Sequence, residues 1–373
     1  MKVPFFVPWI SKNDKKSIMN VLDQRWLTNG PQIKKFEQMF REFLKTKYCV
    51  GVGSATNALH LSLRALNIGP GDEVIVPTFT FAASANAVDF CQGTPILTDV
   101  DSSTFNITAS EIEKNISKKT KAIVVVHYGG QSCDMSEIMK ISKKNKIPVV
   151  EDCAHSLGSL YKGKMCGSIG STGCFSFYPT KVITTGEGGM LSTNSSNLFK
   201  IVNSLRTHGM SILPPQREKK GSWKYDIKDL GYNYRLDEIR SALGISQLMR
   251  INDINKKRIN LANIYTKKLS KVPGIITPIQ KPDRNHIYHL YTIKITKDYH
   301  LTRNELFEKL HKSGIGSSVQ YIPLHDMSFY KQKYRSKQNK FKNSNLIKNQ
   351  VLSLPLFPTM TKKQIEFVIK TIQ

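Results

Sequence analysis

Between residues 73 and 151, short apolar segments alternate with amphipathic ones, and few folds accommodate such a sequence. This alternation is typical of an α/β fold, in which helices cover both faces of a central, mostly parallel sheet. Ligands in these folds bind at the carboxyl ends of the strands, so polar residues there are the candidates for chemistry. The pattern predicts strands at 73–76, 95–100, 122–126 and 148–151, and helices at 81–90, from 109, and at 135–144.

The flanking segments add elements at both ends of this region. Residues 212–224 and 331–342 are expected to be exposed loops, because they are polar and rich in lysine. From the N-terminus onward, the sequence predicts helices from Ser11 and at 32–44, a strand at 48–53, a helix from Ala55, helices at 236–247 and 252–269, strands at 289–295 and 317–321, and two helices with capping boxes, Thr302/Glu305 and Thr361/Gln364.

The chain of 373 residues exceeds an ordinary single domain. We expect a large domain over residues 1–235, which includes the N-terminal segment, and a smaller C-terminal α+β domain over residues 236–373. Helices begin near Asn233, and the boundary is placed in that helical region.

The net charge of +27 would attract polyanions, but the basic residues are scattered and form no arginine stripe. We therefore expect no nucleic-acid partner. Six cysteines show neither a CxxC pair nor the spacing of metal ligands, so we expect no metal and a reducing, cytoplasmic location. No apolar stretch suits a signal peptide or a membrane span, and no membrane association is expected.

A lysine stands at the end of a buried segment in the stretch TGCFSFYPTKVITTGEGGM (172–190). The apolar run 174–178 predicts a strand, and Lys181 follows it after Pro179 and Thr180. A desolvated amine is nucleophilic and can form a Schiff base with pyridoxal 5′-phosphate (PLP). The alternative is a lysine whose charge reaches solvent from the strand end.

A carboxylate and an imidazole follow the strand expected at 148–151. Asp152 could face the pyridine nitrogen of PLP and keep it protonated, or it could cap the next turn. His155, three residues later, could hydrogen-bond the ring hydroxyl, or it could be a buried histidine with internal partners. Each of these two assignments gains weight from the lysine, because a PLP site needs all three groups.

Two further segments fit a phosphate cradle and a stacking ring. Gly53 and the small residues after it, including Ala55 and Thr56, open a helix whose free N–H groups can bind an anion. Phe81 could stack on the pyridine ring, with Phe79 as its rival and core packing as the alternative for both.

These stretches resemble the DegT/DnrJ/EryC1/StrS family of PLP-dependent sugar aminotransferases, which have the type I aminotransferase-like fold. The resemblance runs nearly end to end, through WLTNGP (26–31), GSATNALHLSL (53–63), PTFTFAASANAV (77–88), VVHYGGQSCDM (125–135), EDCAHSLGS (151–159), SFYPTKVITTGEGG (176–189), RTHGM (206–210), GYNYRLDEIRSALGISQL (231–248) and LSLPLFPTMT (352–361).

The resemblance implies that Lys181 is the Schiff-base lysine, Asp152 the partner of the pyridine nitrogen, and His155 the contact of the ring hydroxyl. It also implies a homodimer with shared active sites, because the family's phosphate ligands include an asparagine of the neighbouring subunit. The remaining cofactor contacts that it implies are Ala55, Thr56 and Ser176 at the phosphate, Phe81 on the ring, and Asn233 from that subunit.

The substrate side is expected to include Tyr178, which stands where many family members have histidine. Gln320 likewise departs from the frequent VHY pattern before IPLH. Further candidates for substrate contacts are Thr28, His208, Arg235 and Tyr321.

The expected reaction is amino transfer from L-glutamate to a nucleotide-linked 4-keto-6-deoxy sugar. Lys181 distinguishes this chain from the family's dehydrating branch, whose members resemble the aminotransferases but lack this lysine. The choice of C4 depends on TTGEGG (184–189), although SFYPTK also occurs in enzymes that aminate C3. The alternatives are therefore a C3 aminotransferase acting on a 3-keto sugar and a PLP-binding regulator without turnover.

Overall fold

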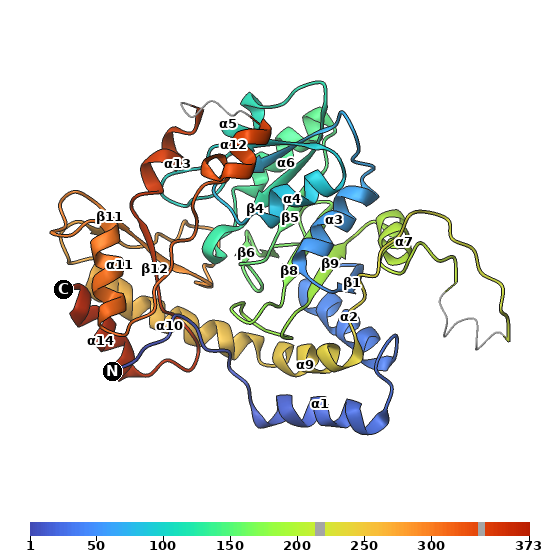
Figure 1. Ribbon diagram of the computed structural model, residues 1–373, viewed down its shortest axis with the longest axis horizontal. Coiled ribbons are helices and arrows are strands. Elements are labelled where there is room, and N and C mark those ends of the chain that lie inside the picture. The colour runs from blue at the N-terminus through green and yellow to red at the C-terminus, as the bar shows by residue number, and fades with distance from the viewer. Residues whose placement is uncertain (213–220, 335–339) are drawn as a thin grey trace.

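The computed structural model describes residues 1–212, 221–334 and 340–373, and a seven-stranded sheet forms the centre of its larger part (Figure 1). Only β9 is reversed in this sheet, since it is antiparallel to both neighbours while the other strands run in one direction. In sheet order the strands are β1 (Tyr48–Val52), β9 (Gly189–Thr193), β8 (Thr172–Ser176), β5 (Val149–Asp152), β4 (Thr120–Val126), β2 (Glu73–Pro77) and β3 (Thr94–Thr98).

The strands bury both faces, as their continuous apolar sequences require. Val74 and Val76 pack on one face with α3 (Ala55–Ala65) and α4 (Ala83–Phe90). Ile75, between them, points to the other face and packs with the second layer of helices. That layer contains α5 (Ala109–Lys114) and α6 (Met135–Asn145).

The other end of the sheet is covered by helices that are distant in sequence. Phe175 and Phe177 meet Phe36 and Phe40 of α2 in one aromatic cluster. The helices around this end are α1 (Lys12–Gln24), which packs on α9, and α2 (Pro31–Leu44), α7 (Ser196–Leu205) and α9 (Glu238–Leu248).

A second core surrounds a three-stranded antiparallel sheet. Val3 and Ile372 are both buried in it, so the two termini lie on this side of the molecule (Figure 1). The elements of this part are β10 (Ile275–Ile276), β11 (Tyr291–Ile295), β12 (Val351–Leu354), α10 (Ile251–Leu269), α11 (Arg303–Lys312) and α14 (Lys362–Ile372).

The chain crosses between the two cores more than once. Helix α10 starts in the core of the large sheet at Ile251 and ends in the second core at Leu269. After β11 the chain returns, and Tyr330 of α12 (Ser328–Tyr334) and Phe341, before α13 (Lys342–Ile347), pack in the large core. The division into residues 1–235 and 236–373 stays a prediction.

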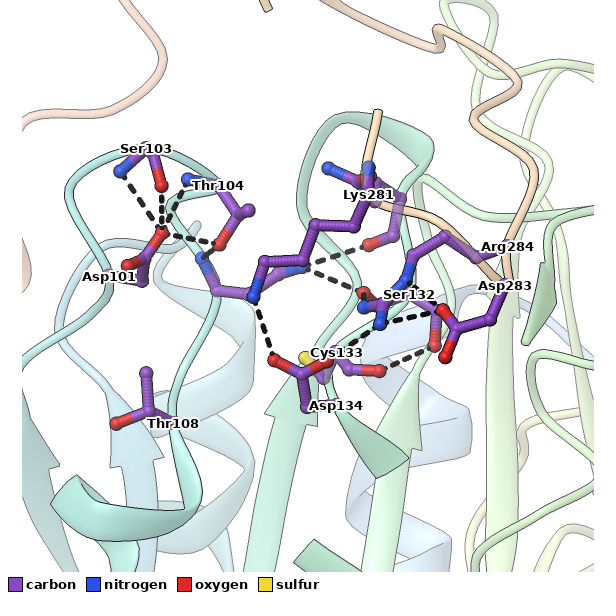
Figure 2. Close-up of polar contacts among 12 residues, drawn as sticks. Asp101, Ser103, Thr104, Thr108, Ser132, Cys133, Asp134, Lys281, Asp283 and Arg284 are labelled. Carbon is purple, nitrogen blue, oxygen red and sulfur yellow. Dashed lines mark hydrogen bonds and ion pairs between the residues drawn. The ribbon is translucent and has the colours of Figure 1, made fainter. Parts of the chain in front are cut away.

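A cluster of charges fixes the segment before β11 on the large sheet (Figure 2). Asp134, just before α6, accepts hydrogen bonds from Arg284 at 2.7 Å and from Lys281 at 2.9 Å. Arg284 also donates to the carbonyl of Ser132 at 3.0 Å. These contacts hold the chain that leads directly to His289 beside the candidate site.

The expected strands and helices of residues 11–152 are confirmed within a few residues, and so are the capping boxes of α11 and α14. The strand expected at 317–321 is wrong. Only Ser318 pairs with β12, at Ser353, because the carbonyl of Gln320 instead accepts a hydrogen bond from the Tyr128 hydroxyl.

The loop expected at 331–342 is also wrong where the structure describes it. Residues to Tyr334 belong to α12, which Tyr330 anchors by donating to Asn86 at 2.6 Å, and Lys342 begins α13. Residues 213–220 of the other expected loop lie outside the described residues. Throughout the described ranges, no helix combines the length and apolar composition that a membrane crossing requires.

Candidate active site

A cavity of about 440 Å³ opens at the carboxyl ends of β4, β5 and β8 and at the N-terminus of α3. This is the edge of the sheet where the strand pattern predicts a ligand. The predicted site residues that line the cavity are Ala55, Thr56, Phe81, Asp152, His155, Ser176, Tyr178, Lys181 and Tyr321.

Lys181 lies in the loop between β8 and β9, where the chain leaves the sheet and turns back. Its amine is partly shielded from solvent inside the cavity. Burial lowers the pKa of the Lys181 amine to about 8, and the Asp152 carboxylate opposes that shift. About a tenth of the amine is therefore unprotonated at pH 7, far more than for an ordinary lysine, and this is the form that a nucleophile or a base requires.

Asp152 is the last residue of β5, and its side chain is buried. It accepts hydrogen bonds from the Ser84 hydroxyl at 2.8 Å and from the backbone N–H of Ala154 at 3.1 Å. Burial raises the pKa of the Asp152 carboxyl, while these hydrogen bonds and the Lys181 amine oppose the rise. Asp152 thus stabilises a local turn and also faces the cavity, so the two interpretations of its role are compatible.

His155 is buried, and both ring nitrogens have partners. Its Nδ1 accepts the backbone N–H of Gly129 at 3.3 Å, so the proton of the neutral ring lies on Nε2, 2.9 Å from the Tyr321 hydroxyl. Burial and the charge of Lys181 hold the pKa of His155 well below its ordinary value. A cofactor hydroxyl that reaches Nε2 must share or replace the bond to Tyr321, and this predicted contact stays a prediction.

The N-terminus of α3 fits an anion. Ser54 caps the helix by accepting the N–H of Asn57 at 3.1 Å, and Ala55 and Thr56 of the first turn line the cavity. Glycine at position 189 lets β9 approach, since a Cβ atom there would lie 2.4 Å from the carbonyl carbon of Ser54. The backbone N–H groups and the helix dipole at this end favour a phosphate.

The two candidate stacking rings occupy different environments. Phe79 is fully buried in a core cluster, whereas Phe81 is 62% exposed and lines the cavity. The ring of Phe81 lies 6.1 Å from that of Tyr321, so the two aromatic side chains border the same space. Phe81 is therefore the residue available to a planar ligand.

Four predicted residues do not line this cavity: Thr28, His208, Asn233 and Arg235. The backbone places Asn233 and Arg235 close to its phosphate end, because Arg235 pairs with Val52, directly before Gly53. The side chain of Asn233 is exposed. A single chain thus supplies only part of the predicted set.

Two residues that touch this set were missed by the sequence analysis. Ser84 is a hydrogen-bond donor to Asp152, and its only signal was a hydroxyl in the first turn of an expected helix. Tyr128 is buried, and its hydroxyl donates a hydrogen bond to the carbonyl of Gln320. The two residues are 192 positions apart, so no local sequence pattern predicts this contact.

His127, Glu151 and Cys153 place three ligand-type atoms within 4.8 Å of one another. However, His127 Nδ1 accepts the N–H of Cys133 at 3.1 Å, and Nε2 donates to Glu151 at 2.9 Å. Glu151 also accepts the N–H groups of Gly167, Ile169 and Gly170. No lone pair of the imidazole remains for a metal ion, and the cluster is a buried hydrogen-bond network.

The cavity fits PLP in size and in chemistry. Its volume falls in the range of cofactor sites. It joins an amine of lowered pKa, a buried carboxylate, an exposed aromatic face and a helix N-terminus. These residues correspond to the groups that hold and activate this cofactor.

The sequence profile of the DegT/DnrJ/EryC1/StrS aminotransferase family matches residues 8–373. Among curated proteins, the chain is 38% identical over 374 residues to the spore coat polysaccharide biosynthesis protein SpsC of Bacillus subtilis, covering 100% of this chain and 96% of that protein. It is 35% identical over 373 residues to a GDP-perosamine synthase of Escherichia coli O157:H7, covering 99% and 97%.

A solved structure agrees with these sequence relatives. The putative sugar aminotransferase Spr1654 of Streptococcus pneumoniae, in its PMP form, superposes with a TM-score of 0.94 at 29% identity. The match covers 100% of this chain and 98% of the other.

Proposed function

Since the chain belongs to the DegT/DnrJ/EryC1/StrS aminotransferase family and is a PLP-dependent sugar aminotransferase with the type I-like fold, we propose its two substrates. The amino donor is L-glutamate. The acceptor is a nucleotide-linked 4-keto-6-deoxy sugar, and the product is a 4-amino sugar nucleotide for glycan biosynthesis.

The observation that carries the assignment is that Lys181 and Asp152 reach one cavity from the ends of two strands. Bound PLP supplies the aldehyde that takes up the amino group and the ring that stabilises negative charge on the carbon losing a proton. Lys181 supplies the nucleophile for that aldehyde and, once released, the base that moves the proton. Asp152 supplies the negative charge that balances a protonated ring nitrogen.

The relatives support a nucleotide-linked sugar. One is named for GDP-perosamine synthesis and another for a spore coat polysaccharide. The preference for C4 over C3 rests on the resemblance of residues 184–189, which follow Lys181 and border the cavity at Glu187. A C3 acceptor is the alternative that the product analysis below separates.

A homodimer with shared sites completes this proposal. Among the described residues that line the cavity, Lys181 is the only one with a cationic side chain, because His155 is neutral. A cofactor phosphate and a nucleotide diphosphate need further cations and donors. Asn233, Arg235 and His208 of a second copy are the proposed sources of these groups.

We also propose a cytoplasmic location. All six cysteines are buried and free, as is usual for proteins in a reducing compartment.

The test is incubation of the PLP-loaded protein with L-glutamate and a panel of nucleotide-linked 4-keto and 3-keto sugars. Mass spectrometry and NMR of the product locate the new amine. We expect 2-oxoglutarate and a 4-amino sugar nucleotide, and no turnover by Lys181→Ala. A 3-amino product would overturn the choice of carbon, and PLP binding without any 2-oxoglutarate would favour a regulator.

A further inference from the structure

A second and much smaller cavity adjoins the active site. It measures about 10 Å³ and is walled by Thr180, His289 and Gln320 and by apolar side chains of the N-terminal segment and the small sheet. Thr180 and Gln320 also line the large cavity, so this side chamber directly borders the loop of Lys181. Its volume corresponds to roughly one water molecule and is too small for a carboxylate.

Two residues that line the side chamber each carry a buried polar atom without a hydrogen-bond partner among the residues that the structure describes. These atoms are Nδ1 of His289 and Oε1 of Gln320. His289 is only 5% exposed. An unsatisfied buried donor or acceptor costs about 1–3 kcal/mol, and proteins commonly satisfy such groups with an ordered water where space allows.

The backbone and ring of His289 are held in place by neighbours. Arg258 donates to the carbonyl of His289 at 2.6 Å and to that of Tyr288 at 3.2 Å. The His289 ring lies 4.4 Å from that of His155. Burial holds the pKa of His289 well below its ordinary value, and the charges of Lys181 and Arg258 act in the same direction. The neutral ring can pair with a molecule that both donates and accepts.

We propose that the side chamber binds one water molecule that bridges His289 Nδ1 and Gln320 Oε1. Water donates one hydrogen to the amide oxygen and either donates to the imidazole or accepts from it, so both tautomers of His289 are satisfied. Because the two ends of an amide point apart, this bridge turns the N–H₂ group of Gln320 away from the side chamber. Gln320 also lines the large cavity, so the bound water sets this amide as a donor toward the substrate.

The test is a crystal structure of the full-length protein at a resolution that shows ordered water. We expect a density peak within about 2.7–3.2 Å of both atoms. The peak should disappear in Gln320→Met, which keeps the side-chain length but removes the amide. A wild-type map without this peak, or with a peak that contacts neither atom, would overturn the proposal, whatever the protein's transaminase activity.

A matched control is Ser317→Ala. Ser317 lies in the same segment, and its hydroxyl is also buried and unpaired, but it does not line the side chamber. The peak should persist in this variant. If the peak were lost in this variant while His289 and Gln320 kept their positions, these two groups would not be sufficient to hold the water, and the proposal would be contradicted.

Discussion

At the scale of single residues, the site depends on two groups that alter each other's proton affinity. Burial destabilises the charged form of both Lys181 and Asp152, and each charge partly restores the other. Their separate positions, at the end of β5 and in the loop after β8, were accessible from the sequence because both follow buried strands. The hydrogen bond from Ser84 was not, since it joins residues 68 positions apart.

The capture of PLP by the apoprotein should accelerate with pH. With a pKa of about 8, about a tenth of the Lys181 amines are neutral at pH 7 and about nine-tenths at pH 9, so the rate should rise about tenfold. Stopped-flow visible absorbance after addition of PLP measures this rate. Asp152→Asn removes a charge that raises the lysine pKa, so its midpoint should move to lower pH. An unchanged or higher midpoint would contradict the electrostatic coupling.

Phe79 and Phe81 offer a matched pair of substitutions. Phe79→Ala should lower the free energy of unfolding by about 3–5 kcal/mol, because a fully buried ring is lost. Phe81→Ala should change it by less than about 0.5 kcal/mol, because that ring is largely exposed. Urea denaturation of the apoproteins measures both.

The affinity for PLP should show the reverse order. Phe81→Ala should weaken PLP binding about two- to tenfold, the value of an aromatic stacking contact. Titration of the folded apoproteins with PLP, in the absence of urea, measures this affinity. Equal losses of stability in the two variants would contradict the assignment of Phe81 to the cavity.

At the scale of elements, the sequence predicted helix starts that depend on neighbouring residues, but not features that depend on contacts between distant residues. The caps of α1, α11 and α14 involve residues three positions apart, and the sequence predicted all three helix starts. Helix α2 has no side-chain cap at Gly30. Its first N–H groups instead bind Glu238 of α9, more than 200 residues away. A distant contact also explains why the expected strand at 317–321 was wrong. The hydroxyl of Tyr128 donates a hydrogen bond to the carbonyl of Gln320, which is therefore not free to pair with a strand.

Replacing Glu238 should therefore uncouple α2 from α9. Its buried carboxylate accepts the N–H groups of Gly30, Gln32 and Ile33 at 3.0, 2.6 and 3.2 Å. Glu238→Ala leaves these donors unpaired and should cost about 3 kcal/mol of unfolding free energy, measured by urea denaturation. Glu305→Ala, at the exposed capping box of α11, should cost clearly less. If both variants lost a similar unfolding free energy, the buried carboxylate of Glu238 would stabilise the protein no more than an exposed capping residue does.

At the scale of the whole molecule, one chain builds a cavity but only part of the predicted site. Asn233 is exposed, and neither it nor Arg235 lines the cavity, although the backbone brings both near its phosphate end. The resemblance of residues 231–248 placed Asn233 at the phosphate of a neighbouring subunit. Spacing along one chain could not have shown this, because periodicity describes only how a chain packs on itself.

The shared site predicts complementation between two defective variants. Lys181→Ala lacks the nucleophile, and Asn233→Ala lacks the ligand proposed for the partner's phosphate, so each alone should have little activity. After the two are mixed under conditions that exchange subunits, half of the dimers are mixed, and each contains one intact site. Activity should therefore return to about a quarter of the wild-type value per subunit. The transaminase assay before and after mixing measures it, with Lys181→Ala mixed with itself as the control. Activity that stays at the sum of the two separate variants, despite subunit exchange shown by native mass spectrometry, would mean that each chain completes its own site.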